Sequence, residues 1–139
     1  MGTALYDDVK ALICGANFAH LSTLMPDGAP QAAPVWVDLE GDRILVATGE
    51  GSLKARNTRR DGRVALSIVS FDNPYVEAQL RGRVAERWKD ADFKIMDRIS
   101  RKYTGQEFPM RQNPEQRVVL VIEVERARFA KLPFRHTPA

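Results

Sequence analysis

Short runs in which apolar and polar residues alternate make up most of the chain, and turn residues separate them at close intervals. A period of two is typical of strands that bury one face. The pattern predicts six strands, over residues 18–24, 31–39, 43–48, 63–70, 75–88 and 117–128. Turn sequences such as Pro26-Asp27-Gly28 and Asn73-Pro74 join them, so we expect antiparallel hairpins.

Three other segments, 4–14, 53–60 and 90–103, have the periodicity of helices. Ser52 is the expected N-cap of the second, and Cys14, at the end of the first, is expected to be buried. We therefore expect a mainly β (α+β) chain of one domain, residues 1–139, in which six antiparallel strands form a small barrel with short peripheral helices. Because such a barrel has little interior room, a ligand would lie on its flank, where a second subunit can cover it.

Residues that carry chemistry are scarce. The chain has one cysteine and two histidines, without the spacing of a metal site, so we expect no metal. No catalytic residue can be named, and a chain of this kind catalyses a reaction only if a cofactor supplies it. There is no apolar run long enough to span a membrane and no signal-peptide pattern, so we expect a cytoplasmic protein.

Basic residues gather in one place. The formal net charge is only +3, but five basic residues fall within ten positions: Lys54, Arg56, Arg59, Arg60 and Arg63. They follow a strand end and the turn 49–51, so the first N–H groups of the next helix, Ser52 and Lys54 would together suit a phosphate. The alternative is an ordinary capped surface helix with a solvated basic face. The glycine spacing matches neither a Rossmann nor a Walker motif.

The second predicted strand carries small side chains, Ala32 and Ala33, followed by Pro34. A flat ring can approach the backbone of such a strand closely. An edge strand that Pro34 protects from further pairing is the alternative interpretation, and the two are compatible.

These segments together resemble the pyridoxamine-phosphate-oxidase-like split-barrel superfamily, with its FMN-binding and F420-binding branches. The resemblance covers residues 5–128, and its C-terminal half is most similar to the branch that uses the deazaflavin coenzyme F420. It implies a split β-barrel. The segments that carry it are LSTLMPDGAPQAAPVW (21–36), SLKARN (52–57), RDGR (60–63), QLRG (79–82), KYTG (102–105), FP (108–109) and RVVLVIEVER (117–126).

The resemblance also implies site residues. The strand around Pro34 would lie against the cofactor ring, Ser52, Lys54 and Asn57 would hold its phosphate, and Gln79 would approach it, often from the other subunit. Trp88 would flank the substrate or the acidic tail of the cofactor. The full expected set is Gln31, Ala32, Ala33, Pro34, Val35, Ala47, Thr48, Ser52, Lys54, Arg56, Asn57, Arg60, Gln79, Trp88 and Arg117.

One departure from the family favours F420 over FMN. FMN enzymes of this family often place arginines where this chain has Ala33 and Leu53. FMN ends in a phosphate monoester with nearly two charges, whereas F420 has a singly charged phosphodiester and an acidic glutamate tail. One lysine fits one charge better, which leaves Arg56, Arg59, Arg60 and Arg117 for the tail.

We therefore expect a reductase that transfers a hydride from reduced F420 to an unsaturated or conjugated organic substrate. An FMN-dependent oxidoreductase and a non-catalytic cofactor carrier are the alternatives. Nucleic acid is not an expected partner, because no aromatic residues alternate with the basic cluster. We expect a homodimer, because the strand 118–124 is apolar at nearly every position. Trp36 is expected to pack in the core or in that interface.

Overall fold

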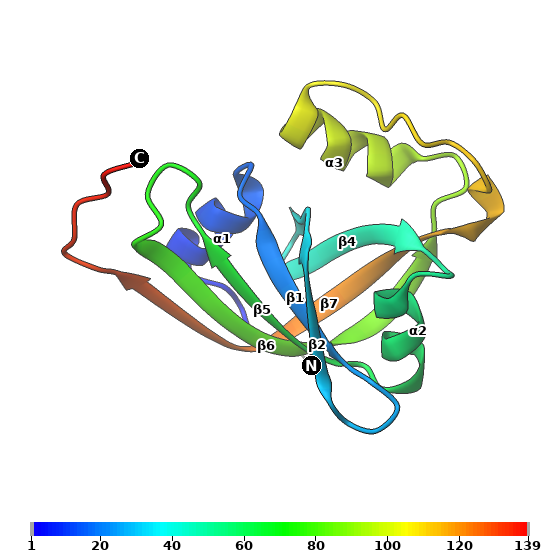
Figure 1. Cartoon of the computed structure of the whole chain (residues 1–139), viewed down its shortest axis with the longest axis horizontal. Helices are drawn as coiled ribbons and strands as arrows, with labels where there is room; N and C mark the ends of the chain where they lie inside the picture. Colours follow the sequence, from blue (N-terminus) through cyan, green and yellow to red (C-terminus); the bar gives the residue numbers. More distant parts are fainter. Residues whose placement is uncertain (1, 139) are drawn as a thin grey trace.

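One twisted antiparallel sheet forms the body of the protein in the computed structural model, which describes residues 2–138 (Figure 1). Its seven strands run in the order β2-β1-β5-β6-β7-β4-β3. The strands are β1 (Ala19–Leu24), β2 (Pro30–Val35), β3 (Asp38–Glu40), β4 (Arg43–Gly49), β5 (Arg63–Val69), β6 (Val76–Lys89) and β7 (Arg117–Lys131). Around them lie α1 (Asp7–Cys14), α2 (Leu53–Arg60), α3 (Lys94–Thr104) and the 3-10 turn η1 (Pro114–Gln116). The mainly β fold with short peripheral helices is confirmed.

The expected count of six strands was wrong, because the predicted strand 31–39 is two strands. β2 pairs with β1 at one edge of the sheet and β3 pairs with β4 at the other. The break falls at Val37, whose N–H donates to the hydroxyl of Tyr103 (3.0 Å) and whose carbonyl accepts from the Lys102 ammonium. The chain thus crosses from edge to edge without closing the sheet by hydrogen bonds.

The apolar strand β7 is buried on both faces within this one chain. Leu120, Ile122 and Val124 belong to the main core. Val119 and Val121 form a second cluster on the other face, against which Trp88 and Ile95 of α3 pack. The apolar run therefore gives no evidence for a dimer, because α3 covers the face that we expected a partner to cover.

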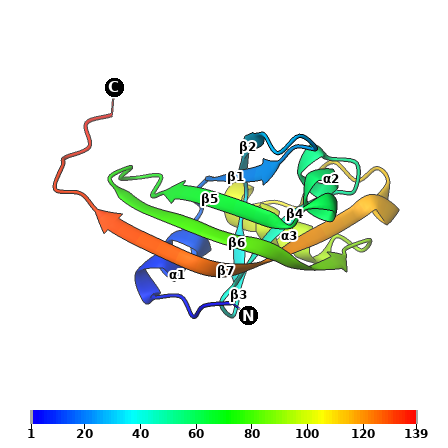
Figure 2. The same ribbon diagram turned by 90° about the horizontal axis from the view of Figure 1, so that it is seen from below.

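The two longest strands, β6 and β7, run side by side along the molecule (Figure 2). Their register shifts between Arg81 and Gly82. At that shift a Cβ on Gly82 would lie 2.0 Å from the carbonyl oxygen of Glu123, so only glycine permits this approach.

The helices differ from expectation mainly at their starts. α2 is as predicted, and the Ser52 hydroxyl accepts from the N–H of Ala55 at 3.2 Å. α3 begins four residues later than expected, because the Asp90 carboxylate accepts from the N–H groups of Ile95 and Met96. Cys14 is exposed, contrary to expectation. Among residues 2–138, no helix is long and apolar enough to cross a membrane.

Candidate functional site

A cavity of about 500 Å³, here called the main pocket, lies between α3, β4, the end of β2 and the start of β7. Figure 1 shows α3 standing over β4, with α2 at the end of that strand. The volume is in the range of small-molecule sites, about 300–1,000 Å³. Its lining is Phe18, Pro34, Val35, Trp36, Ala47, Thr48, Lys54, Met96, Ile99, Phe108, Met110 and Arg117.

The structure brings several expected site residues together in the main pocket, although they are far apart in the sequence. β2 and β4 contribute the floor, α2 contributes one cation, and the first residue of β7 contributes another. The expected residues that line the main pocket are Pro34, Val35, Ala47, Thr48, Lys54 and Arg117.

The α2 end of the main pocket can hold an anion. The Thr48 hydroxyl donates to the Ser52 hydroxyl (2.9 Å), so the cap is fixed to the end of β4. The first N–H groups of a helix have no partner within it and attract negative charge. Lys54 adds an ammonium group, and within residues 2–138 no carboxylate forms an ion pair with it. Burial lowers the pKa of Lys54, as expected for a half-buried cation without a counter-ion.

The α3 end of the main pocket is aromatic. The rings of Trp36 and Tyr103 stack within 6° of parallel, with their centroids 5.2 Å apart. Phe108 meets Trp36 edge-on at 6.5 Å, and Phe18 lies 5.6 Å from Tyr103. Trp36 is half-buried on the pocket wall and does not pack in the core; its other expected place, a subunit interface, stays a prediction. These aromatic side chains provide apolar faces for a flat ligand.

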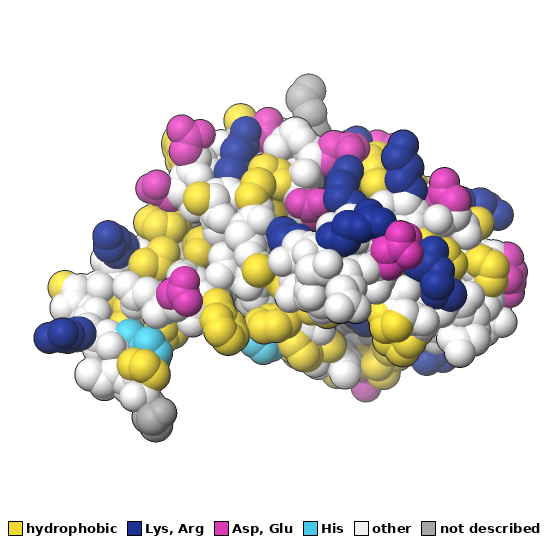
Figure 3. All heavy atoms as spheres, turned by 90° about the horizontal axis from the view of Figure 1, so that it is seen from above, with side chains coloured by type: hydrophobic (Ala, Val, Ile, Leu, Met, Phe, Trp, Pro, Cys, Tyr) yellow, Lys and Arg dark blue, Asp and Glu magenta, His cyan; other side chains and the backbone are white. Residues whose placement is uncertain are grey.

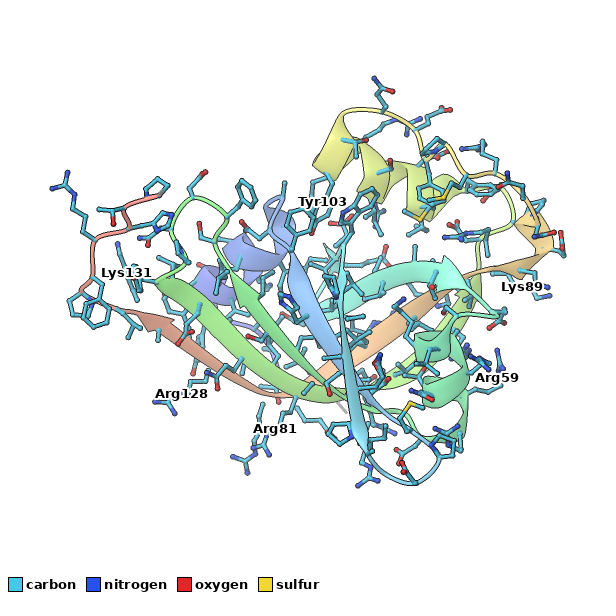
Figure 4. All side chains as sticks on the ribbon, in the orientation of Figure 1. Arg59, Arg81, Lys89, Tyr103, Arg128 and Lys131 are labelled. Carbon is cyan, nitrogen blue, oxygen red and sulfur yellow. The ribbon has the colours of Figure 1, made fainter. Side chains whose placement is uncertain are left out.

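Tyr103 fastens this aromatic end to the sheet. Its hydroxyl donates to the carbonyl of Asn17 (2.6 Å) and accepts from Val37 N–H. Figure 4 shows Tyr103 pointing from α3 toward the strands. Burial raises the pKa of Tyr103, so the hydroxyl keeps its proton and can donate.

The segment 105–116 forms the outer wall of the main pocket through Phe108 and Met110. Asp97 of α3 holds this wall: it accepts from Phe108 N–H (3.0 Å) and from both terminal nitrogens of Arg111 (2.9 and 3.2 Å). The bonds from Arg111 hold the pKa of Asp97 below its usual value. Ion pairs of this kind are common near α3, and the face seen in Figure 3 carries basic and acidic side chains next to one another.

Sequence reasoning missed six residues of the main pocket. Met96 and Ile99 belong to the apolar stripe predicted for the third helix, which we assigned only to packing. Phe108 lies in a segment that supported the family resemblance, but nothing local indicated that the segment folds back over β4. The six missed residues are Phe18, Trp36, Met96, Ile99, Phe108 and Met110.

The basic cluster does not form one patch. Arg59 pairs with Glu50 (2.7 Å) and Arg63 pairs with Asp61 (2.7 Å). Arg60 donates to the carbonyl of Leu24 (2.6 Å), and Arg56 is exposed. Only Lys54 of the five reaches the main pocket, because successive helical positions point in different directions.

Other expected residues serve the fold or face elsewhere. Asn57 is buried and donates to the Thr23 hydroxyl (3.0 Å), which fastens α2 to β1. Trp88 donates to Glu86 (3.2 Å), and Arg43 lies over its ring. Gln31 and Ala33 are half-buried in β2, opposite residues of β1.

Ala32 and Gln79 line a second groove of about 700 Å³, here called the outer groove, together with Arg81, Arg126 and Arg128. Figure 4 shows Arg81 and Arg128 pointing away from the molecule on the side opposite α3. Residues of the outer groove therefore cannot join the main pocket of their own chain.

Known proteins agree with this architecture. The sequence profile of the pyridoxamine 5'-phosphate oxidase family matches residues 5–131. A structure named F420 reductase superposes with a TM-score of 0.79 at 25% identity, covering 86% of this chain and 94% of its own. A conserved hypothetical protein of Mycobacterium tuberculosis gives 0.74 at 23% identity, covering 99% and 94%. A Listeria innocua protein provisionally named a pyridoxamine 5'-phosphate oxidase gives 0.66 at 23%, covering 88% and 95%.

A comparison with curated proteins finds no match. The profile match nevertheless spans nearly the whole chain, and the solved structures share its sheet and helices. This protein belongs to the pyridoxamine 5'-phosphate oxidase family of split-barrel proteins, whose members include oxidoreductases with flavin-type cofactors.

Proposed function

We propose that the protein is an F420-dependent oxidoreductase that binds the deazaflavin in the main pocket and reduces an unsaturated or conjugated organic substrate. The observation that supports this most is Lys54, a half-buried cation without a carboxylate partner among residues 2–138, at the N-terminal end of α2. Partial burial of a charge is costly unless an anion accompanies it.

The α2 end suits a phosphate with one charge. Lys54 and the first N–H groups of α2 supply donors, and the Ser52 hydroxyl, which accepts from Thr48 and Ala55, keeps its own proton to donate; together they carry only one full charge. Leu53 and Ala33 carry no charge, and Lys54 is the one cation of α2 or β2 that lines the main pocket among residues 2–138. The name of the F420 reductase supports the same cofactor.

The rest of the main pocket suits a flat ring. Three lining residues, Val35, Ala47 and Ile99, are apolar. Pro34 has no backbone N–H group, so a ring that covers it leaves no donor without a hydrogen-bond partner. When bound and reduced, the deazaflavin would supply a hydride. The chain itself would bind the phosphate, orient the ring between β2 and α3, and exclude water with the aromatic wall.

FMN is the second candidate, and Arg117 is the observation that favours it. Its guanidinium lines the main pocket as Lys54 does, so two cations are present in one cavity. If both cations bound one phosphate, their two positive charges would balance the nearly two negative charges of a phosphate monoester.

We also propose that two copies of the chain assemble. Ala32 and Gln79 lie in the outer groove, and only the outer groove of a partner could bring such residues to a cofactor. Phe71 and Phe134 are large apolar side chains left exposed, at 69% and 60%, and a partner would cover them.

The test of the proposed cofactor site replaces the Lys54 ammonium by a neutral side chain. Lys54→Gln should weaken F420 binding roughly tenfold to a hundredfold, because a charge-assisted hydrogen bond contributes about 1.5–3 kcal/mol. Lys131→Gln removes the same charge at an exposed position outside the main pocket and serves as the control. Binding is followed by quenching of the deazaflavin fluorescence. A Lys54→Gln protein that folds and binds F420 as tightly as the control would refute this site.

A further inference from the structure

The described chain has three partly buried arginines, Arg43, Arg87 and Arg117. They differ in whether an acidic side chain forms an ion pair with them. Arg43 pairs with Glu86, and Arg87 pairs with Glu50 at 2.8 Å. Arg117 forms no ion pair with any residue of the range 2–138. Its Nε is also the one buried side-chain nitrogen or oxygen in that range without a hydrogen-bond partner.

The surroundings of Arg117 are apolar. Its Nη2 donates to the sulfur of Met96 (3.2 Å), a weak acceptor, and its guanidinium lies 5.2 Å and 5.8 Å from the ring centroids of Phe108 and Phe93. Burial lowers the pKa of Arg117, but an arginine stays charged in proteins. The site therefore holds a permanent cation with most of its donors unused.

The charge of Asp90 offsets the burial of Arg117 only in part. The two Asp90 carboxylate oxygens accept from Ile95 and Met96 N–H at the start of α3, and Asp90 forms no ion pair with Arg117. A half-buried arginine without an ion-pair partner costs stability. Such a cost is expected where a ligand supplies the missing anion.

We propose that Arg117 binds a carboxylate of the organic substrate, so that the substrate class is a planar, conjugated carboxylate. This rests on the proposed function, in which Lys54, which also lines the main pocket, holds the cofactor phosphate. A guanidinium pairs with a carboxylate through two parallel hydrogen bonds. The ring of Phe108 lies beside Arg117 and meets Trp36 edge-on, so an aromatic surface continues from the anion site toward the stacked pair of Trp36 and Tyr103 and suits a flat conjugated group.

The experiment compares two probes of the same shape, trans-cinnamate and its neutral amide, cinnamamide. Each is titrated calorimetrically into the wild type, Arg117→Gln, Arg117→Lys, Lys54→Gln and Arg135→Gln, alone and with saturating oxidised F420. Arg135 is an exposed arginine outside the main pocket. Melting curves identify folded variants, and Arg117→Lys, which keeps the charge but not the paired donors, serves if Arg117→Gln does not fold.

The wild type should bind cinnamate roughly tenfold to a hundredfold more tightly than cinnamamide. The preference should disappear in Arg117→Gln, shrink in Arg117→Lys, and persist in Lys54→Gln and Arg135→Gln. Equal binding of the two probes by the wild type would overturn the proposal, as would a preference that survives Arg117→Gln or depends on Lys54.

Two outcomes separate this inference from the proposed function. If Arg117→Gln weakens F420 itself more than about tenfold, Arg117 serves the phosphate or acidic tail of the cofactor, and the assignment to substrate is wrong. If the wild type binds no F420 but shows the Arg117-dependent preference, the proposed function fails and the carboxylate site stands.

Discussion

Tyr103 is the side chain that joins α3 to Val37, at the break between β2 and β3, and to Asn17, just before β1, and Tyr103→Phe isolates that role. The variant keeps the ring that stacks on Trp36 at 5.2 Å. It removes the hydroxyl that donates to Asn17 O (2.6 Å) and accepts from Val37 N–H (3.0 Å). A buried donor left without its partner costs about 1–3 kcal/mol. Because Tyr103 is only half-buried, we expect a loss near the lower end, about 1–2 kcal/mol.

Urea unfolding measures this loss. With a slope of about 2 kcal/mol per molar urea, the midpoint should fall by about 0.5–1 M. Tyr6→Phe makes the same chemical change at a residue that is 80% exposed and should leave the midpoint unchanged. Equal midpoints for the two variants would refute the role assigned to the Tyr103 hydroxyl.

The difference in stability between the wild type and Tyr103→Phe should also depend on pH. Burial raises the folded-state pKa of Tyr103, so above pH about 10 the unfolded chain loses this proton before the folded chain does. The contribution of the hydroxyl is therefore complete below pH about 10 and is lost as the pH rises through the folded-state pKa. The stability gap between wild type and Tyr103→Phe should narrow above that pH, and a gap that widens would contradict the burial argument.

Three further predictions concern the fold and assembly. Gly82→Ala should destabilise by about 3 kcal/mol or prevent folding, because its Cβ would lie 2.0 Å from Glu123 O; a melting temperature within a degree or two of wild type would contradict the close approach. Asp97→Ala should speed hydrogen exchange of the Phe108 amide at least about tenfold, since it removes the acceptor of that N–H, and unchanged exchange would show that the wall is held by other contacts. Light scattering at micromolar concentration should give a mass near twice 15.6 kDa, whereas a monomer would remove the proposed partner contribution.

Local signals predicted α2 well. The signals that start and end this helix are local. Ser52 caps its first turn, and Asp61-Gly62 directly follows its last residue, so the sequence specifies the cap and both ends. Lys54 was identified for the same reason, and the main pocket contains it.

Long-range contacts explain most of what the sequence did not predict. Nothing near Val37 indicates that Tyr103 and Lys102, more than sixty residues later, interrupt the strand there. The apolar run of β7 correctly indicated burial on both faces, but the sequence could not tell that α3 supplies the second cover. Arg117 lacks a carboxylate hydrogen bond because Asp90 accepts from the start of α3 instead, which only the fold reveals.

The most direct test of the account is the affinity of the purified wild-type protein for the two cofactors. F420 and FMN are titrated separately under the same conditions and then in competition, with bound cofactor identified after gel filtration. With Lys54 as the single cation of α2 that lines the main pocket, F420 should bind at least about tenfold more tightly than FMN. Tighter binding of FMN, or no binding of either cofactor, would contradict the central claim.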